Sequence, residues 1–219
     1  TSSSAIDGPA IWSPDGEQIV FYSERDEKFA LYRMSANGRG VAEHLVDLPG
    51  EMAVPSHWTP DGSSVIFSYR GNNDSYDIGV LSVEGEPEWV PLLETEIEET
   101  NGNVSPDGQW IAYTSDETGS PEVYIERFPD LGFRTLVSTG GGRNPVWSKD
   151  GRELFYRDLD RGVLMAVEIT NEPALVVGLP ETLFSGRYGL TRLEMRVYDV
   201  SPDGQRFLML KETRDSDDD

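Results

Sequence analysis

Five aspartates recur along the chain in one short motif, and evenly repeated carboxylates could bind a metal or transfer protons. They are Asp15, Asp61, Asp107, Asp150 and Asp203, and each is followed by a glycine: Gly16, Gly62, Gly108, Gly151 and Gly204. In Ser/Thr-Pro-Asp-Gly, proline presets the first turn position, aspartate can bond back to the backbone, and glycine accepts the left-handed position. We interpret these residues as structural turns, because carboxylates on five successive turns are not expected to converge on one site.

Other residues that could carry chemistry are few. The chain has no cysteine, and its two histidines are His44 and His57. Disulfides and thiolate metal sites are therefore excluded, and neither a histidine zinc site nor a Ser-His-Asp triad is expected. The glycines at 140–142 precede no predicted helix, so we interpret them as a link rather than a phosphate loop. No Gly-x-Ser-x-Gly pentapeptide of a hydrolase occurs. The sequence predicts a protein that is not an enzyme and holds no resident cofactor.

The spacing of the turns points to a repeat architecture. The motif begins at residues 13, 59, 105, 148 and 201, and regular intervals of this size are typical of repeat proteins. Each turn is followed by a β-branched and aromatic stretch, such as 18–23 or 110–115, and then by further short strands. No segment shows a 3.6-residue period. Four antiparallel strands in each repeat predict the blades of an all-β propeller.

We predict four full repeats and a partial fifth. The expected blades are residues 8–50, 51–97, 98–140, 141–190 and the partial 191–212, followed by a disordered acidic tail at 213–219. The fifth repeat has only two predicted strands, so the ring is expected to be incomplete or open. Exposed edges of such a ring predict self-association.

Polar residues of the strand before each turn are candidates for binding at the mouth of the central channel. These are His57, Asn101, Asn103, Arg143, Asn144, Arg196 and Asp199. They could contact a peptide or small ligand, or they could bond to backbone and channel water.

Acidic residues are predicted in the loops at one rim. They are Asp26 and Glu27, Asp74 and Asp77, Asp116 and Glu117, and Asp158 and Asp160. Such a rim could bind Ca²⁺ or a basic partner, or be merely solvated; no metal site is assigned.

The charge of the chain narrows the possible partners. The formal net charge is −22, so binding to nucleic acid is not expected. No apolar run is long enough to span a bilayer, so direct insertion into a membrane is not expected either. A protein or peptide partner fits this composition best.

The Trp-Ser-Pro-Asp-Gly turn followed by an apolar strand resembles the WD40-like, or PD40, repeat of TolB-type β-propellers. The stretches 105–169 and 198–210 resemble the carboxy-terminal propeller of bacterial eukaryotic-like serine/threonine protein kinases, and the likeness covers residues 8–211. It implies a kinase domain upstream, a non-catalytic sensor role for the propeller, and an extracytoplasmic or periplasmic location. The chain itself has no kinase Gly-rich loop, His-Arg-Asp or Asp-Phe-Gly.

Three functional hypotheses follow. The first is a non-catalytic propeller that binds a protein, peptide or ligand, as the sensor of a larger signalling protein or as a free periplasmic TolB-like scaffold. The second is a propeller that gates a prolyl-oligopeptidase-like hydrolase encoded outside this chain. The third is a propeller lyase or glycosidase, for which the sequence offers no specific sign.

Overall fold

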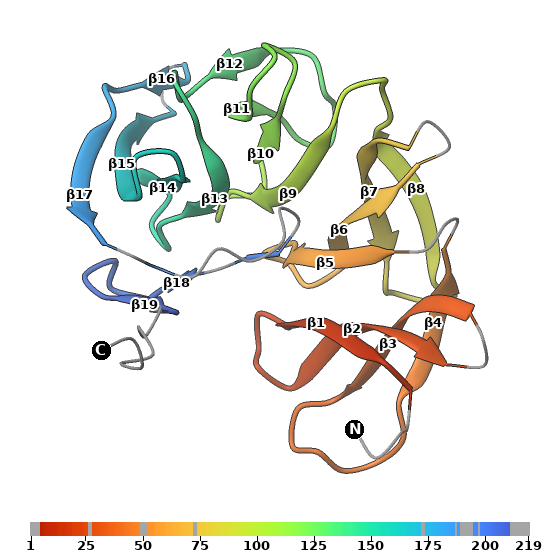
Figure 1. Ribbon diagram of the computed structural model, residues 1–219. Coiled ribbons are helices and arrows are strands. Elements are labelled where there is room, and N and C mark those ends of the chain that lie inside the picture. Colours follow the sequence, from red (N-terminus) through yellow and green to blue (C-terminus); the bar gives the residue numbers. More distant parts are fainter. Residues whose placement is uncertain are drawn as a thin grey trace, which may run out of the picture.

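The strands of this chain form a ring of antiparallel sheets. The computed structural model describes residues 5–25, 28–48, 52–71, 74–171, 174–186, 188, 195–196 and 198–210, and no helix occurs among these residues. Four sheets contain four principal strands each, and a fifth contains two (Figure 1). The predicted all-β propeller with a partial fifth blade is therefore confirmed. The ring is open between the fifth sheet and the first.

The strands follow the chain blade by blade. The first two blades comprise β1 (Asp7–Trp12), β2 (Gln18–Arg25), β3 (Lys28–Ser35), β4 (Glu43–Asp47), β5 (Ala53–Trp58), β6 (Ser64–Arg70), β7 (Tyr76–Ser82) and β8 (Glu88–Leu93). The others comprise β9 (Glu99–Val104), β10 (Trp110–Ser115), β11 (Glu122–Arg127), β12 (Arg134–Leu136), β13 (Arg143–Trp147), β14 (Glu153–Asp158), β15 (Val163–Thr170), β16 (Val176–Val177), β17 (Glu181–Ser185), β18 (Tyr198–Val200) and β19 (Phe207–Met209). The predicted tail at 213–219 lies outside the described residues.

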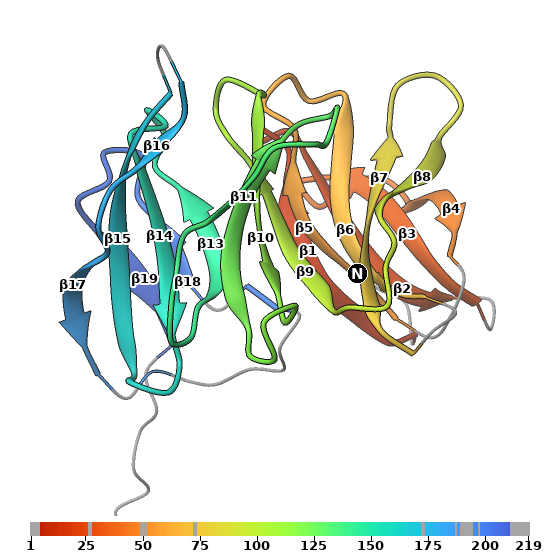
Figure 2. The same cartoon turned by 90° about the horizontal axis from the view of Figure 1, so that it is seen from above.

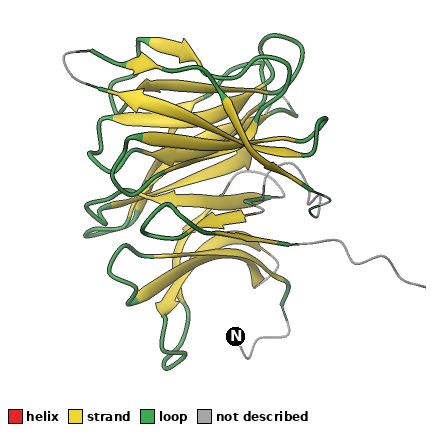
Figure 3. Ribbon diagram, turned by 90° about the vertical axis from the view of Figure 1, so that its left-hand side faces the viewer, coloured by secondary structure: helices red, strands yellow, loops and turns green. Residues whose placement is uncertain are grey.

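Each complete blade places its strands in chain order from the axis outwards. The order is β1-β2-β3-β4 in the first blade and β5-β6-β7-β8 in the second. The innermost strands β1, β5, β9 and β13 contact one another in succession. Figure 2 shows the sheets side by side, and Figure 3 shows that strands and loops make up the described chain. This order brings one strand of every blade to the central axis.

The repeated turn joins the first and second strands of each blade. In the second copy, the Gly62 N–H donates to the carbonyl of Thr59 at 2.9 Å. The Oδ1 of Asp61 accepts the Thr59 hydroxyl at 2.6 Å and the Ser63 N–H at 3.1 Å. Gly62 has a φ of 76°, which L-residues with a Cβ rarely adopt. The aspartate side chain thus bonds into its own turn.

The cores lie between neighbouring blades, because each sheet is apolar on both faces. Between the first and second blades, Val20 and Leu31 pack with Trp58 and Phe67. The third and fourth blades share a second cluster that includes Ala112, Trp147 and Leu154. Complete burial of such an apolar side chain contributes about 2 kcal/mol relative to exposure. Each blade is therefore stabilised mainly by its neighbours.

Replacing Gly62 by alanine should strain the turn without a steric clash. An added Cβ at Gly62 meets nothing within 4 Å, so the positive φ is the only obstacle. We expect the free energy of unfolding to fall by about 1 kcal/mol. Urea denaturation measures the change. Gly132→Ala is the matched control, because that position also has open space and is not among the positive-φ glycines. Equal effects of the two substitutions would contradict this account of the turn.

Candidate functional site: the central channel

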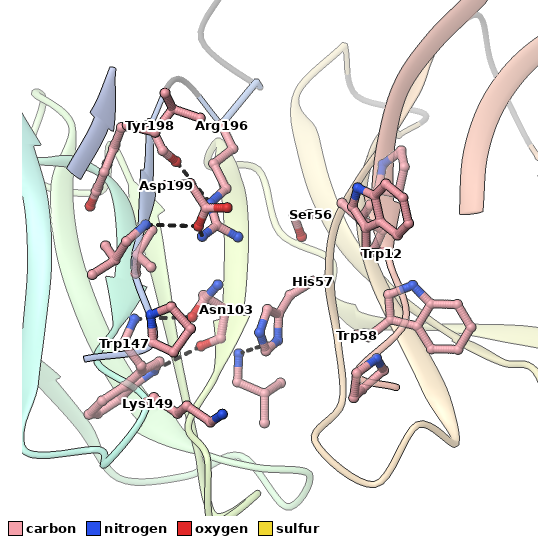
Figure 4. Close-up of a pocket in the computed structure, with 18 of the residues that line it drawn as sticks. Trp12, Ser56, His57, Trp58, Asn103, Trp147, Lys149, Arg196, Tyr198 and Asp199 are labelled. Atoms are coloured by element: carbon pink, nitrogen blue, oxygen red, sulfur yellow. Dashed lines mark hydrogen bonds and ion pairs between the residues drawn. The ribbon is translucent and has the colours of Figure 1, made fainter. Parts of the chain in front are cut away.

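A cavity of about 840 Å³ lies on the axis of the ring, within the range of small-ligand sites. Its wall is formed by the inner strands and by the turns that follow them. Figure 4 shows Asn103, Arg196 and Asp199 on one side of it, Trp12 and Trp58 on the other, and His57 between. The cavity therefore brings together residues that are far apart in the sequence.

Several equivalent positions of the blades line this cavity, and one of them carries most of the polar side chains. It is the residue directly before the last residue of each inner strand, two positions ahead of the turn motif. In chain order, these residues are Ile11, His57, Asn103, Val146 and Asp199. The repeat thus places one equivalent residue of each blade along the cavity wall. Three of the five are polar, whereas Ile11 and Val146 also pack on the cores between blades.

His57 is a neutral hydrogen-bond donor in this ring. Its Nδ1 accepts the backbone N–H of Val104 at 3.2 Å, so the proton of the neutral imidazole resides on Nε2. Burial, together with the nearby Arg196 cation, lowers the pKa of His57 to about 3. The imidazole of His57 therefore stays uncharged at neutral pH. Nε2 has no hydrogen-bond partner among the residues that the structure describes, which leaves its N–H available to a ligand.

Asn103 joins the third and fourth blades and leaves its amide nitrogen available. Its Oδ1 accepts the backbone N–H of Trp147 at 3.3 Å, and its carbonyl accepts the indole N–H of Trp147 at 3.0 Å. Since Oδ1 faces a donor, the orientation of the amide is fixed. Nδ2 makes no hydrogen bond within the described part of the chain, although the residue is only 4% exposed. Asn103 is thus a second donor in the cavity wall.

Arg196 and Asp199 form an ion pair in the partial fifth blade. The Arg196 guanidinium bonds to the Asp199 carboxylate and also donates from Nε to the Tyr198 carbonyl at 3.1 Å. The same carboxylate oxygen accepts the backbone N–H of Val200 at 2.8 Å. Their charges largely cancel where they face the cavity.

Lys149 supplies a positive charge at the mouth of the cavity. It occupies the turn position that proline holds in the other repeats, and the residues at this position all line the cavity: Pro14, Pro60, Pro106, Lys149 and Pro202. Lys149 is exposed and forms no salt bridge with any residue in the described ranges. Lys149 is not among the predicted channel residues, because a type I turn accepts lysine in place of proline. The signal that could have identified it is the repeat itself, because identical turns must encircle the axis at one end.

Three other predicted channel residues lie outside the cavity lining. Asn101 and Asn144 have φ values of 59° and 55° at irregularities of β9 and β13. Their backbone N–H groups donate to Ser68 Oγ at 3.1 Å and Thr114 Oγ1 at 3.2 Å, which links neighbouring blades. Arg143, at the start of β13, pairs in register with Arg157. The cavity therefore gathers four of the seven candidates: His57, Asn103, Arg196 and Asp199.

The aspartates of the turns do not offer free carboxylates to the cavity. The pKa values of Asp15, Asp61, Asp150 and Asp203 are lowered, first by the hydroxyl two residues earlier and then by a backbone N–H. Asp107 accepts the equivalent hydroxyl of Ser105 at 2.6 Å and the N–H of Gln109 at 3.0 Å. Each side chain is therefore occupied by its own turn.

At the opposite rim, some of the acidic residues predicted in loops are exposed and others are paired or buried. Asp74 pairs with Arg70 at 3.4 Å, and Glu117 pairs with Arg134 at 2.7 Å. Asp116 accepts the N–H of Glu98 at 3.0 Å. Two residues expected in loops lie buried in strands, namely Asp77 in β7 and Asp158 in β14, while Asp160 is exposed. Asp26 and Glu27 fall outside the described residues.

A metal site at this rim is not seen among its described residues. Over the described ranges, no three histidine, aspartate or glutamate side chains are arranged to hold a metal ion. Binding of Ca²⁺ stays a prediction.

Two buried carboxylates meet at the turn between the second and third blades. Thr95 links them: its N–H donates to Asp77 Oδ1 at 3.3 Å, and its hydroxyl bonds to Glu99 Oε1 at 2.9 Å. Burial raises the pKa of Glu99 to about 7 and also raises that of Asp77. The charges that act on Glu99 are Asp77 and Asp116, which raise its pKa further, and Arg134, which lowers it.

Comparison with known proteins supports a propeller fold. No family model matches the chain. Over 166 residues it is 25% identical to the Agrobacterium fabrum protein named "Uncharacterized protein Atu1656". This match covers 66% of this chain and 52% of that protein. Over 68 residues it is 41% identical to "Uncharacterized peptidase YuxL" of Bacillus subtilis, covering 30% of this chain but 10% of that protein. The chain thus spans about half of one relative and a small part of the other.

Solved structures show the same architecture. TolB from Acinetobacter baumannii superposes with a TM-score of 0.75 at 21% identity, over 98% of this chain and 51% of that one. The periplasmic gluconolactonase PpgL of Pseudomonas aeruginosa gives a TM-score of 0.63 at 17% identity, over 90% of this chain and 63% of that one. These likenesses support the TolB-type propeller fold. They do not support the resemblance to kinase propellers, which stays a prediction.

The described chain has no helix that is long and apolar enough to cross a membrane.

Glu99 should make the protein more stable in mild acid. A folded-state pKa of about 7, against an ordinary 4.5, means that the folded protein binds this proton more tightly than the unfolded chain does. The contribution is fully present below about pH 4.5 and is lost as the pH rises through about 7. Glu99→Gln should therefore flatten the loss of stability between about pH 5 and about pH 7.5, as measured by urea unfolding.

The control for this measurement is Glu86→Gln, which changes an exposed glutamate. Its stability profile should follow that of the unmodified protein. If Glu99→Gln keeps the full slope in this window, Glu99 is not the group that titrates.

Proposed function

We propose that this chain is a non-catalytic propeller that binds a peptide, or a small ligand of similar chemistry, in its central channel. The observation that carries the proposal is the ring of equivalent positions around the cavity, where His57 Nε2 and Asn103 Nδ2 have no partner among the described residues. Neither nitrogen is among the fully buried unpartnered atoms, and both residues line the cavity, so an acceptor on a ligand can reach these donors and bond to them. No constellation of nucleophile and base lies among these polar groups.

The cavity wall favours a ligand with apolar groups and hydrogen-bond acceptors. Three tryptophans, Trp12, Trp58 and Trp147, line it together with the prolines of the turns. The serine hydroxyls of the turns are used locally; Ser148 Oγ, for example, donates to Asp150 at 2.8 Å. The polar groups left available are mainly donors, and Lys149 adds a positive charge. Peptide carbonyls and carboxylates fit this inventory.

The larger setting of the module is part of the same proposal. The resemblance to kinase propellers favours a sensor role in a bacterial signalling protein outside the cytoplasm, and the likeness to TolB is equally compatible with a periplasmic scaffold. The formal charge of −22 favours a protein or peptide partner over nucleic acid.

A second candidate function has one observation in its favour. Residues of this chain match a peptidase of Bacillus subtilis at 41% identity over a short segment. In that case the propeller would gate access to a hydrolase domain outside this sequence. Peptidase activity in a longer natural form of the protein, absent from this chain alone, would favour this candidate.

Reversing the charge at the channel mouth should weaken ligand binding. Peptides would be selected against the immobilised chain by phage display, and the dissociation constants of the selected peptides would be measured by calorimetry. Because Lys149 is exposed and forms no salt bridge with the described residues, Lys149→Glu should fold normally. We expect it to raise the dissociation constant of an acidic or carboxylate-ended peptide at least tenfold, about 1.4 kcal/mol.

Arg39→Glu is the matched control, since it makes the same charge change at an exposed residue outside the cavity lining. Its affinity should stay within about twofold of the unmodified chain. Peptides that bind both variants equally would place the binding surface elsewhere and refute the channel proposal.

A further inference from the structure

The last residue of each inner strand shows that one blade face is uncovered. At this position Trp58, Val104 and Trp147 are 5%, 1% and 7% exposed, whereas Trp12 is 64% exposed. All four residues precede the same turn, so the sequence places them equivalently. The difference lies in the neighbouring blade: within the described ranges a preceding sheet covers three of these residues, and no sheet covers Trp12.

The closed joints show what normally covers this position. Trp58, at the end of β5, packs in one cluster with Val20 and Leu31 of the first blade. Trp147 packs against the third blade and donates its indole N–H to the Asn103 carbonyl at 3.0 Å. In each case the preceding sheet provides an apolar second strand. No such sheet lies against the exposed face of β1 in the part of the chain that the structure describes.

The other side of the gap is equally incomplete. The fifth sheet has only β18 and β19. Leu208 of β19 and Leu210, directly after this strand, are 75% and 62% exposed. Its opposite face is packed, since Phe207 contacts Phe155 with ring centroids 5.1 Å apart. Leu208 and Leu210 line the same cavity as Trp12. Apolar residues therefore face the gap from both sides, as at an interaction surface.

The sequence of β1 indicates which kind of sheet fits against it. β1 and β5 share the pattern Pro-x-x-Trp, as Pro9 to Trp12 and Pro55 to Trp58, whereas β9 and β13 carry Asn101 and Asn144 at the position of the proline. The sheet that covers β5 is the first blade itself. We propose that a further blade of the same repeat type, with apolar residues where the first blade has Val20 and Leu31, docks on β1 in the gap between β19 and β1.

Two observations favour a blade over a second copy of the whole chain. The chain corresponds to about half of the length of a TolB structure with the same fold, so related chains contain further segments. A net charge of −22 also makes two copies repel each other. A single blade has the form that the other joints of this ring accept.

A duplication of the repeat tests the proposal. Trp12 and Trp58 are 46 positions apart, so residues 1–51 followed directly by residues 6–219 insert one repeat in register. In the added copy, Trp12→Phe removes the competing indole, so the original Trp12 reports alone. A second duplicated variant lacks the original Trp12 as well. The difference in acrylamide quenching between the two duplicated proteins gives the quenching of the original Trp12. We expect its accessibility to fall several-fold, from 64% exposure towards the 5% of Trp58.

The control duplication carries Val20→Asp and Leu31→Asp in the added copy, which removes its apolar face. It should leave the original Trp12 as accessible as in the unmodified chain. The proposal is overturned if Trp12 stays accessible in the unmodified duplication. It is also overturned if the single chain dimerises and protects Trp12, because a second copy would then be the occupant. Neither outcome depends on whether the channel binds a peptide.

Discussion

The structure depends on one packing constraint: every sheet is apolar on both faces and must be covered on both. Val20, Ile66, Ile111 and Leu154 lie in the second strands of four successive blades, and each is fully buried. No single four-stranded sheet can bury such residues by itself. Stacking the sheets around an axis provides the cover, and the short connections between repeats keep sequence neighbours adjacent in space.

The channel is a consequence of this stacking. Once the first strand of each blade lies at the axis, the residues at the end of that strand line the channel, and the turns that follow gather at one mouth. The protein varies the side chains at these fixed positions: His57 and Asn103 bridge blades and point donors inwards, and Lys149 replaces a proline at the mouth. A chain that is strongly acidic overall therefore presents donors and a local positive charge where the blades converge.

Much of the architecture could be predicted from the sequence, because the turn chemistry and the strand residues are local. The candidate site could be predicted only in part. Asn101 and Asn144 belong to inner strands but do not line the cavity. Each of them adopts a left-handed backbone conformation at an irregularity of its strand. This irregularity depends on the pairing with the neighbouring strand. Asp77 was predicted in a loop but lies buried in β7. Its burial near the end of the strand depends on the adjoining blade, which the local sequence does not indicate. The exposure of Trp12 has the same origin, since its motif differs from that of buried Trp58 only in having Ser13 where the other has Thr59.

The most direct test of the packing account is hydroxyl-radical footprinting of the unmodified chain, with oxidation of each tryptophan quantified by mass spectrometry at a concentration where the protein is monomeric. The account predicts rapid oxidation of Trp12 and strong protection of Trp58, Trp110 and Trp147, in keeping with their burial. Protection of Trp12 equal to that of Trp147 would mean that the face of β1 is already covered, and would contradict the account.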